Sequence, residues 1–302
     1  MKIWIIVAFC LEIGVVALLT PLASRVAKKL GIVAHANPEV PTHTKTIALL
    51  GGMAILAGLL PVLLIAQRGD GRWRMVLLAL FPVVLLGLYK DKVESPVSPL
   101  IQIGVQTLAV LPLLYGGLRL SVSGIVPVDL FLTIIASLWI MNSWNFLDVM
   151  DGLASGVATI IAALFAVIAL RFGEIPLALV ASSLAGCTFG FLLHNLPPAK
   201  IFLGDSGSFA IGLLFAVFTL FSSSGIRSTA ACGLLLFVPL FDLVFASVAR
   251  WRAGRSPVNA GAEHISLQLL NRGWSNWRVI MLAYVVTIIL GSMAFAFLAG
   301  RS

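Results

Sequence analysis

The residues of this chain that are best suited to chemistry gather in a few short polar stretches. In residues 141–156, MNSWNFLDVMDGLASG, Asn142, Asn145, Asp148 and Asp151 recur at every third position and precede Gly152. This spacing keeps the four side chains roughly on one side of a helical turn, where they could bind a base, a sugar or a metal ion. Asparagine and aspartate are also ordinary caps of helix ends, which is the purely structural alternative.

A second stretch, NLPPAKIFLGDSGS at residues 195–208, surrounds one carboxylate with small residues. Asp205 lies between Gly204 and Gly207, and Ser206 and Ser208 supply hydroxyl groups at the start of the next apolar segment. A carboxylate at the start of a helix can hold Mg²⁺ while nearby backbone N–H groups face a phosphate. Considered alone, Asp205 could equally be a helix cap.

Two further stretches are charged but less specific. In GLYKDKVESP, residues 87–96, Asp91 lies between Lys90 and Lys92, a pattern that is typical of a solvated loop. Residues 239–257 and 261–275 are basic and contain His264, and a single histidine in a loop is usually not catalytic.

The elements that must position these residues are set by an unusually apolar composition. Of 302 residues, 60% are hydrophobic and 11% are charged, whereas soluble domains carry roughly a quarter charged residues. An ordinary soluble enzyme and a disordered chain are therefore excluded, and an integral membrane protein is predicted. In such a chain the net charge of +8 indicates loop residues that set topology and attract anionic lipid or phosphate, rather than nucleic acid.

Apolar runs long enough to cross a bilayer predict an all-α, polytopic protein with about ten transmembrane helices. The longest connection, 249–278, leaves no room for a separate soluble domain, so residues 1–302 are expected to form one membrane domain. The predicted spans are 3–22, 46–66, 75–89, 99–116, 126–142, 155–170, 175–194, 207–222, 229–248 and 279–299.

Ten spans place both termini on one side of the membrane, so alternate loops share the other side. Those loops hold 12 of the 20 basic residues, which predicts that they are cytoplasmic and that both termini face outward. Most of the acidic residues fall in the same loops, where carboxylates at helix ends are costly unless they pair, bind metal or face water. A metal or phosphate site is therefore expected among loops 23–45, 90–98, 143–154, 195–206 and 249–278.

Together, these stretches resemble the polyprenyl-phosphate N-acetylhexosamine-1-phosphate transferases, or glycosyltransferase family 4, over nearly the whole chain. The most specific matches are residues 142–156 and 195–208. Weaker matches are His43 followed by Leu50-Gly51-Gly52, Gln106 after the acidic stretch, and Asp242 with the basic stretch that ends at Pro257.

This resemblance implies transfer of a sugar-1-phosphate from a UDP-amino sugar to undecaprenyl phosphate, with release of UMP. It also implies a Mg²⁺ cofactor, with Mn²⁺ as an alternative, and an active site on the cytoplasmic face of the bacterial inner membrane. The reaction would begin the lipid-linked synthesis of a cell-envelope polysaccharide. Because an anionic phosphate must attack a diphosphate, metal and cationic side chains have to offset the repulsion.

The resemblance also assigns roles to individual residues. Asp205 would ligate Mg²⁺, Asp91 would be a second metal-proximal or base-like carboxylate, and His264 would lie near the diphosphate. The expected substrate-binding residues are His43, Lys90, Asn145, Asp148, Asp151 and Asn195.

The chain departs from the family pattern at three places. Lys90 replaces the first of two adjacent aspartates, Ser266 and Leu267 replace histidines that usually follow the position of His264, and the first loop lacks its usual acid and basic pair. The reduced histidine pattern favours the N-acetylglucosamine branch over the muramoyl-pentapeptide branch. An ammonium at position 90 would repel Mg²⁺ or hold a phosphate, which leaves a catalytically impaired binding or regulatory homologue as one alternative.

Two other classes of protein compete with this interpretation. CDP-alcohol phosphotransferases also space aspartates as Asp148-x-x-Asp151-Gly152, but their pattern continues with an Ala-Arg step and two further aspartates that are missing here. A transporter or scaffold would suit ten helices, yet transporters usually bind near mid-membrane between detectable repeats, and no repeat is found. Family members often pair, so a homodimer is among the expected partners.

Overall fold

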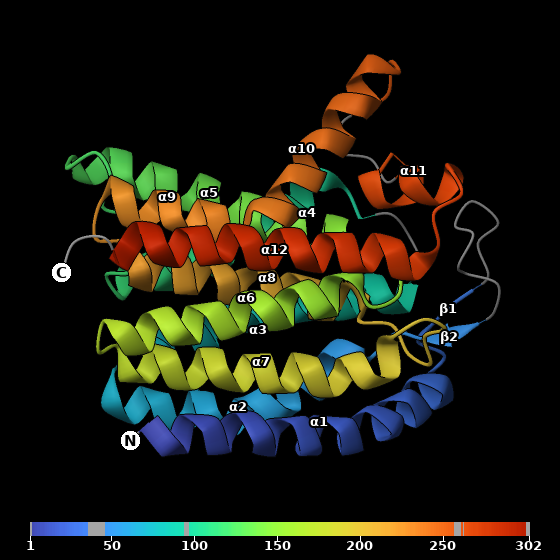
Figure 1. Cartoon of the computed structure of the whole chain (residues 1–302), viewed down its shortest axis with the longest axis horizontal. Coiled ribbons are helices and arrows are strands. Elements are labelled where there is room, and N and C mark those ends of the chain that lie inside the picture. Colours follow the sequence, from blue (N-terminus) through green and yellow to red (C-terminus); the bar gives the residue numbers. More distant parts are fainter. Residues whose placement is uncertain (1, 36–45, 94–96, 257–260, 262, 300–302) are drawn as a thin grey trace.

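The computed structural model describes residues 2–35, 46–93, 97–256, 261 and 263–299. Within these ranges it is almost entirely helical, and most helices lie roughly side by side (Figure 1). The helices are α1 (Lys2–Leu30), α2 (Gly51–Gly69), α3 (Arg72–Val93), α4 (Pro99–Tyr115), α5 (Val126–Leu147), α6 (Leu153–Arg171), α7 (Ile175–Asn195), α8 (Gly204–Ser222), α9 (Ile226–Leu235), α10 (Phe237–Arg252), α11 (Ile265–Asn271) and α12 (Asn276–Ala299).

The all-α, polytopic membrane fold is confirmed, but the count of ten spans is not. In the described part of the chain seven helices are long and apolar enough to cross a membrane, or eight if the bent pair α9–α10 is one span. The other two predicted spans, 75–89 and 99–116, correspond to α3 and α4. The first carries five charged residues near its two ends, and the second has only 17 residues.

The predicted span 229–248 is broken into two helices that meet at an angle of 75°. Pro239 explains the break, because it has no N–H group to donate to the carbonyl oxygen of Leu235 one turn earlier. As a result α10 leans away from the other helices, as Figure 1 shows at the top of the view.

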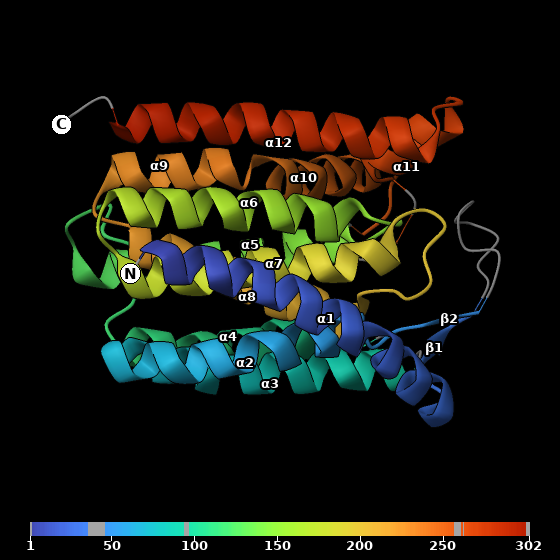
Figure 2. The same ribbon diagram turned by 60° about the horizontal axis from the view of Figure 1, so that its bottom comes forward.

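Helix α8 forms the centre of the bundle. It packs against α3 and α5 over long stretches and also contacts α2, while α7 lies between α1 and α6 (Figure 2). Its apolar side chains include Phe215, which contacts the rings of Trp144, Phe165 and Phe218. The start of α8, where Asp205 lies, is therefore held by the surrounding helices.

Two short segments tie the loops before α2 and α8 together. Strand β1 (Val33–Ala34) pairs antiparallel with β2 (Ile47–Ala48). The N–H of Phe202 donates to the carbonyl of Ala48 at 2.8 Å, and the N–H of Gly52 donates to the carbonyl of Leu203 at 2.8 Å. The first residues of α2 and α8 therefore lie side by side, where a Cβ on Gly52 would come within 2.1 Å of the Gly207 Cα.

The connections that carry the polar stretches gather at one end of the molecule. Figure 1 shows both chain termini at one end, and β1, β2, α11 and the connection between α7 and α8 at the other. This is the arrangement expected for alternating loops. The helices run further than predicted, however: α5 ends at Leu147 and thus includes Asn145, and α11 lies inside the predicted loop 249–278.

Candidate active site

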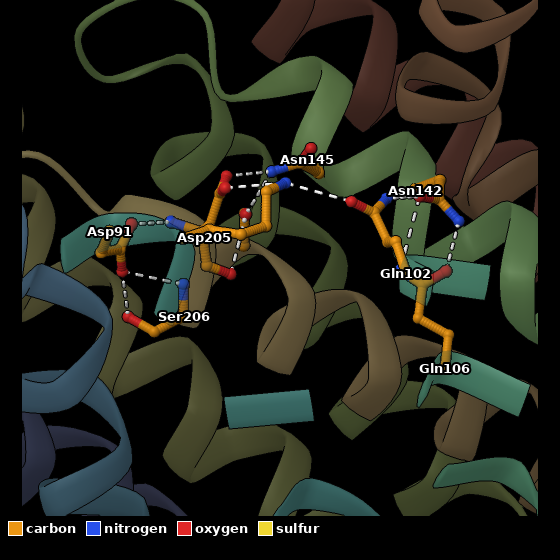
Figure 3. Close-up of polar contacts among 9 residues, drawn as sticks. Asp91, Gln102, Gln106, Asn142, Asn145, Asp205 and Ser206 are labelled. Carbon is orange, nitrogen blue, oxygen red and sulfur yellow. Dashed lines mark hydrogen bonds and ion pairs between the residues drawn. The ribbon is translucent and has the colours of Figure 1, made fainter. Parts of the chain in front are cut away.

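Asp91 is brought to the start of α8 by a close contact between two helices. A Cβ on Gly87 would lie 2.2 Å from the Cα of Ser206, so only glycine lets α3 approach α8 this closely. One turn later, Asp91 accepts hydrogen bonds from the N–H groups of Asp205 (2.7 Å) and Ser206 (3.1 Å) and from the Ser206 hydroxyl (2.8 Å), as Figure 3 shows. Asp91 therefore caps α8 from a neighbouring helix, where a negative charge is favourable.

The side chain of Asp205 contacts groups from two other helices, α3 and α5. Its Oδ2 lies 2.8 Å from the Lys90 Nζ, and the side chains of Lys90 and Asp205 are 18% and 29% exposed. Its Oδ1 accepts a hydrogen bond from Asn145 Nδ2 at 2.5 Å, and Asn145 also donates to the Ser208 hydroxyl at 3.0 Å. Both carboxylate oxygens of Asp205 thus have partners, and one of these partners is a cation.

A chain of amide side chains continues from Lys90 between α4 and α5. The Lys90 ammonium donates to Gln102 Oε1 at 3.1 Å, and Gln102 Nε2 donates to Asn142 Oδ1 at 2.7 Å. Asn142 Nδ2 then donates to Gln106 Oε1 at 2.8 Å, and Gln106 is fully buried (Figure 3). The polar network of the site therefore extends into the apolar part of the bundle.

A cavity of about 410 Å³ opens beside this network. Asp148, the residue that follows α5, lines it and is only partly exposed. Burial, followed by the nearby carboxylates of Asp205, Asp91 and Asp151, raises the pKa of Asp148 to about 8. The cavity therefore concentrates negative charge, and its polar lining residues are His35, Lys90, Asp91, Asp148, Asn195 and Asp205.

Asn195 holds the two most specific sequence stretches together. Its Oδ1 accepts hydrogen bonds from the Gly152 N–H at 3.0 Å and the Ser155 hydroxyl at 2.8 Å. Its Nδ2 donates to the carbonyl of Ile201 at 3.0 Å. Asp151 has a similar position, because its Oδ2 accepts the Ala199 N–H at 2.9 Å. Both side chains thus fix the connection between α7 and α8 against the start of α6.

His264 lies in a separate, buried cluster between α10 and α11. Its Nδ1 is 2.8 Å from Asp242 Oδ2, and its Nε2 is 3.1 Å from a terminal nitrogen of Arg250. Arginine can only donate, so Nε2 accepts and Nδ1 carries the hydrogen. Arg250 also pairs with Glu263 at 3.0 Å and stacks over the ring of Phe146 on α5. Both ring nitrogens of His264 are therefore committed within this cluster.

The structure brings most of the predicted site residues together. Lys90, Asp91, Asn145 and Asp205 form one network, Asp148 and Asn195 line the same cavity, and Asp151 lies just behind it. Of the four residues spaced by three, only Asp148 lines the cavity, and the other three contact separate partners. His264 is not among the residues that line the cavity, and His43 lies outside the described residues. The chemical roles assigned to these residues stay predictions.

Two residues of these polar networks were not predicted from the sequence. Gln102 links Lys90 to Asn142, and its position four residues before Gln106 in an apolar helix could have revealed a shared polar face. Glu263 pairs with both Arg250 and Arg255, and no pattern in the sequence indicated that pairing.

The donor atoms around the cavity suit a divalent cation that takes few ligands from protein. Among the residues that the structure describes, no group of three or more His, Cys, Asp or Glu side chains is arranged to hold a metal ion. Magnesium commonly binds through one or two carboxylates and completes its shell with water and substrate phosphates. Asp205 and Asp148 both line the cavity and could provide those carboxylates.

Comparison with known proteins matches these motifs to one family. The sequence model of glycosyl transferase family 4 matches residues 73–223. The probable undecaprenyl-phosphate N-acetylglucosaminyl 1-phosphate transferase of Bacillus subtilis is 30% identical over 96% of this chain and 84% of its own length. The chain belongs to glycosyl transferase family 4.

Other members of the family show the same branch. A decaprenyl-phosphate N-acetylglucosaminephosphotransferase of Mycobacterium tuberculosis is 32% identical, covering 86% of this chain and 74% of its own length. The undecaprenyl-phosphate alpha-N-acetylglucosaminyl 1-phosphate transferase of Escherichia coli O157:H7 is 25% identical, covering 90% and 78%. The family match spans Lys90, Asp91 and Asp205 but ends before α10, so His264 lies beyond it.

Proposed function

We propose that this protein transfers an N-acetylhexosamine-1-phosphate from a UDP-sugar to a polyprenyl phosphate such as undecaprenyl phosphate, releasing UMP. Family membership and the names of the relatives support this reaction. The observation that carries it is the cavity at one end of the helices, which Asp148 lines together with the ion pair of Lys90 and Asp205. A diphosphate and a lipid phosphate need such a mixture of oxygen ligands and fixed positive charge.

In this reaction, an oxygen of the lipid phosphate attacks the phosphorus atom that carries the sugar. The new P–O bond forms as the bond between the two phosphates of the donor breaks, and UMP takes the bonding electrons. Lys90 would neutralise phosphate oxygens, and Asn145 would orient the Asp205 carboxylate. Asn195 and Asp151 would hold the loops that shape the sugar and nucleotide pocket.

The cofactor would be Mg²⁺, with Mn²⁺ as a substitute, held by Asp205 with Asp148 or Asp91. When bound, it would withdraw charge from the diphosphate oxygens during transfer. Asp91 already accepts three hydrogen bonds at the start of α8, so its first contribution is to hold Asp205 in place.

The site would lie on the cytoplasmic side of a bacterial inner membrane. The excess of lysine and arginine in the loops at this end supports that orientation. Both termini lie at the opposite end in Figure 1 and would therefore face outward. Pairing of two copies remains part of the expectation from the family.

The test is UMP release by the purified protein in detergent. The assay would supply undecaprenyl phosphate and a panel of UDP-amino sugars, with Mg²⁺ or with EDTA. We expect release from UDP-N-acetylglucosamine or a related sugar, strictly dependent on the divalent cation and abolished in Asp205→Asn. No release from any donor, with protein that elutes as a single species, would overturn the proposal.

A further inference from the structure

Lys90 places a positive charge inside the site, and the inference drawn from its position rests on the proposed function. Three groups hold the Lys90 ammonium: Asp205 Oδ2 at 2.8 Å, Gln102 Oε1 at 3.1 Å, and the ring of Phe209 with its centre at 4.7 Å. An oxygen of Asp205 that could bind a divalent cation is thus already paired with a positive charge.

The amide side chains next to Lys90 are oriented to accept a hydrogen bond from position 90. Because Lys90 donates to Gln102 Oε1, the amide of Gln102 must present its Nε2 to Asn142, whose Oδ1 accepts it. Asn142 in turn presents its own Nδ2 to Gln106. A carboxylate at position 90 would need a donor from Gln102 and would reverse the first link of this chain. In the present orientation the chain of amides thus starts from a donor at position 90.

Two of the three carboxylates that line the cavity, Asp91 and Asp205, already have hydrogen-bond or ion-pair partners. Asp91 accepts three hydrogen bonds from the start of α8, and Asp205 Oδ1 accepts one from Asn145. A cation that binds Asp205 Oδ2 must displace Lys90 against the repulsion of two positive centres a few ångströms apart. Gln102 gives the displaced ammonium a second acceptor, and the phosphate oxygens of a substrate would give it a third.

We propose that Lys90 is a built-in counter-cation of Asp205, so that a divalent cation enters the site together with the diphosphate of the nucleotide sugar and not before it. Without nucleotide, Lys90 balances Asp205 and the cation is held weakly. With nucleotide, phosphate oxygens pair with Lys90 and release Asp205 to the cation. Lys90 thereby couples metal binding to donor binding.

The experiment measures Mn²⁺ binding by the purified protein in detergent, from the electron paramagnetic resonance signal of free Mn²⁺. Titrations are run without nucleotide and with saturating UDP-N-acetylglucosamine. We expect the wild-type protein to bind Mn²⁺ at least about tenfold more tightly with the nucleotide sugar, after correction for Mn²⁺ bound by the nucleotide itself. Tight binding without nucleotide would overturn the inference.

Variants separate the charge of Lys90 from its packing. Lys90→Gln should bind Mn²⁺ at least about tenfold more tightly than the wild type in the absence of nucleotide, whereas Lys90→Arg should stay weak. The matched control is Lys92→Gln, which removes an exposed lysine of the same helix that donates to the carbonyl of Leu30. Equal affinities of Lys90→Gln and wild type would overturn the inference. If Lys90→Gln does not elute as a single species, the wild-type titrations alone decide.

The same preparations keep the two proposals apart. UMP release tests the transferase, while Mn²⁺ binding without nucleotide tests Lys90 as a counter-cation. Tight nucleotide-free binding in an active enzyme would refute only the inference about Lys90. Weak binding that Lys90→Gln tightens, in a protein that releases no UMP, would refute only the transferase.

Discussion

Two regions of this protein pair carboxylates with basic side chains, and they differ mainly in access to solvent. At the start of α8, Lys90 and Asp205 are 18% and 29% exposed and line a cavity. Between α10 and α11, the side chains of Asp242 and His264 are only 3% and 4% exposed, and that of Arg250 is 2% exposed.

This difference separates a cluster that can exchange partners from one that cannot. Lys90 can pair with water or phosphate in place of Asp205, and Asp205 can pair with water or a metal ion in place of Lys90. Asp242 and His264 have no such substitute, because removing one partner leaves the other buried without compensation. The pocket cluster is therefore suited to chemistry, and the α10–α11 cluster is suited to fixing the bent helix against the end of α5.

The largest expected effect is on stability, from removing one acid in each region. Asp242→Ala should lower the free energy of unfolding by about 2–5 kcal/mol, because it leaves the Nδ1–H of His264 and the N–H of Ile265 without their acceptor. Asp205→Ala should change it by less than about 1 kcal/mol, because Lys90 keeps Gln102 and gains water. Thermal and denaturant unfolding in detergent would measure both. Equal losses would show that the two clusters are not different in kind.

The second-largest effect is expected on enzyme activity, from disturbing the close contact between α3 and α8 that positions Asp91. Gly87→Ala would place a Cβ 2.2 Å from the Ser206 Cα and push α3 away from α8. A displacement of about 1 Å at a catalytic site can cost roughly 100-fold in rate, and we expect UMP release to fall by about that factor. Gly104→Ala is the matched control, since its Cβ would meet nothing within 4 Å. Full activity in Gly87→Ala would show that the position of Asp91 is not critical.

The sequence was sufficient for the features that depend on local pattern. Apolar runs predicted the helices, and the glycine and aspartate motifs predicted which loops would meet. The stretches around Asp148 and Asp205 do lie together, joined through Asn195. The contact between Gly152 and Asn195 spans 43 residues, and the alternation of loops between the two sides of the membrane predicted that these stretches would meet.

The features that the sequence did not reveal depend on how helices rotate against each other. The link from Lys90 through Gln102 to Asn142 requires α3, α4 and α5 to turn particular faces inward. The buried position of His264 likewise depends on the break near Pro239, which redirects α10. Spacing along one helix cannot report either arrangement, because both are set by packing between helices.

The smallest expected effect is the pH dependence that Asp148 gives to folding stability, and it tests the comparison of the two regions most directly. Its pKa is about 8 in the folded protein, against an ordinary value of 3.8. Between these values the unfolded chain is ionised at Asp148 while the folded chain holds a proton, so the wild type loses stability as the pH rises through this window. Asp148→Asn removes that loss. In EDTA, the advantage of Asp148→Asn in thermal unfolding should therefore be larger at pH 7.5 than at pH 5.5.

Glu174→Gln, which removes an exposed acid at the start of α7, controls for the loss of one carboxylate. An advantage of Asp148→Asn that is the same at both pH values would mean that burial and the neighbouring carboxylates do not hold a proton on Asp148. It would also remove the contrast with the α10–α11 cluster, where each carboxylate already has a basic partner. A growing advantage would show that burial and the neighbouring carboxylates keep a proton on Asp148 even with Lys90 present.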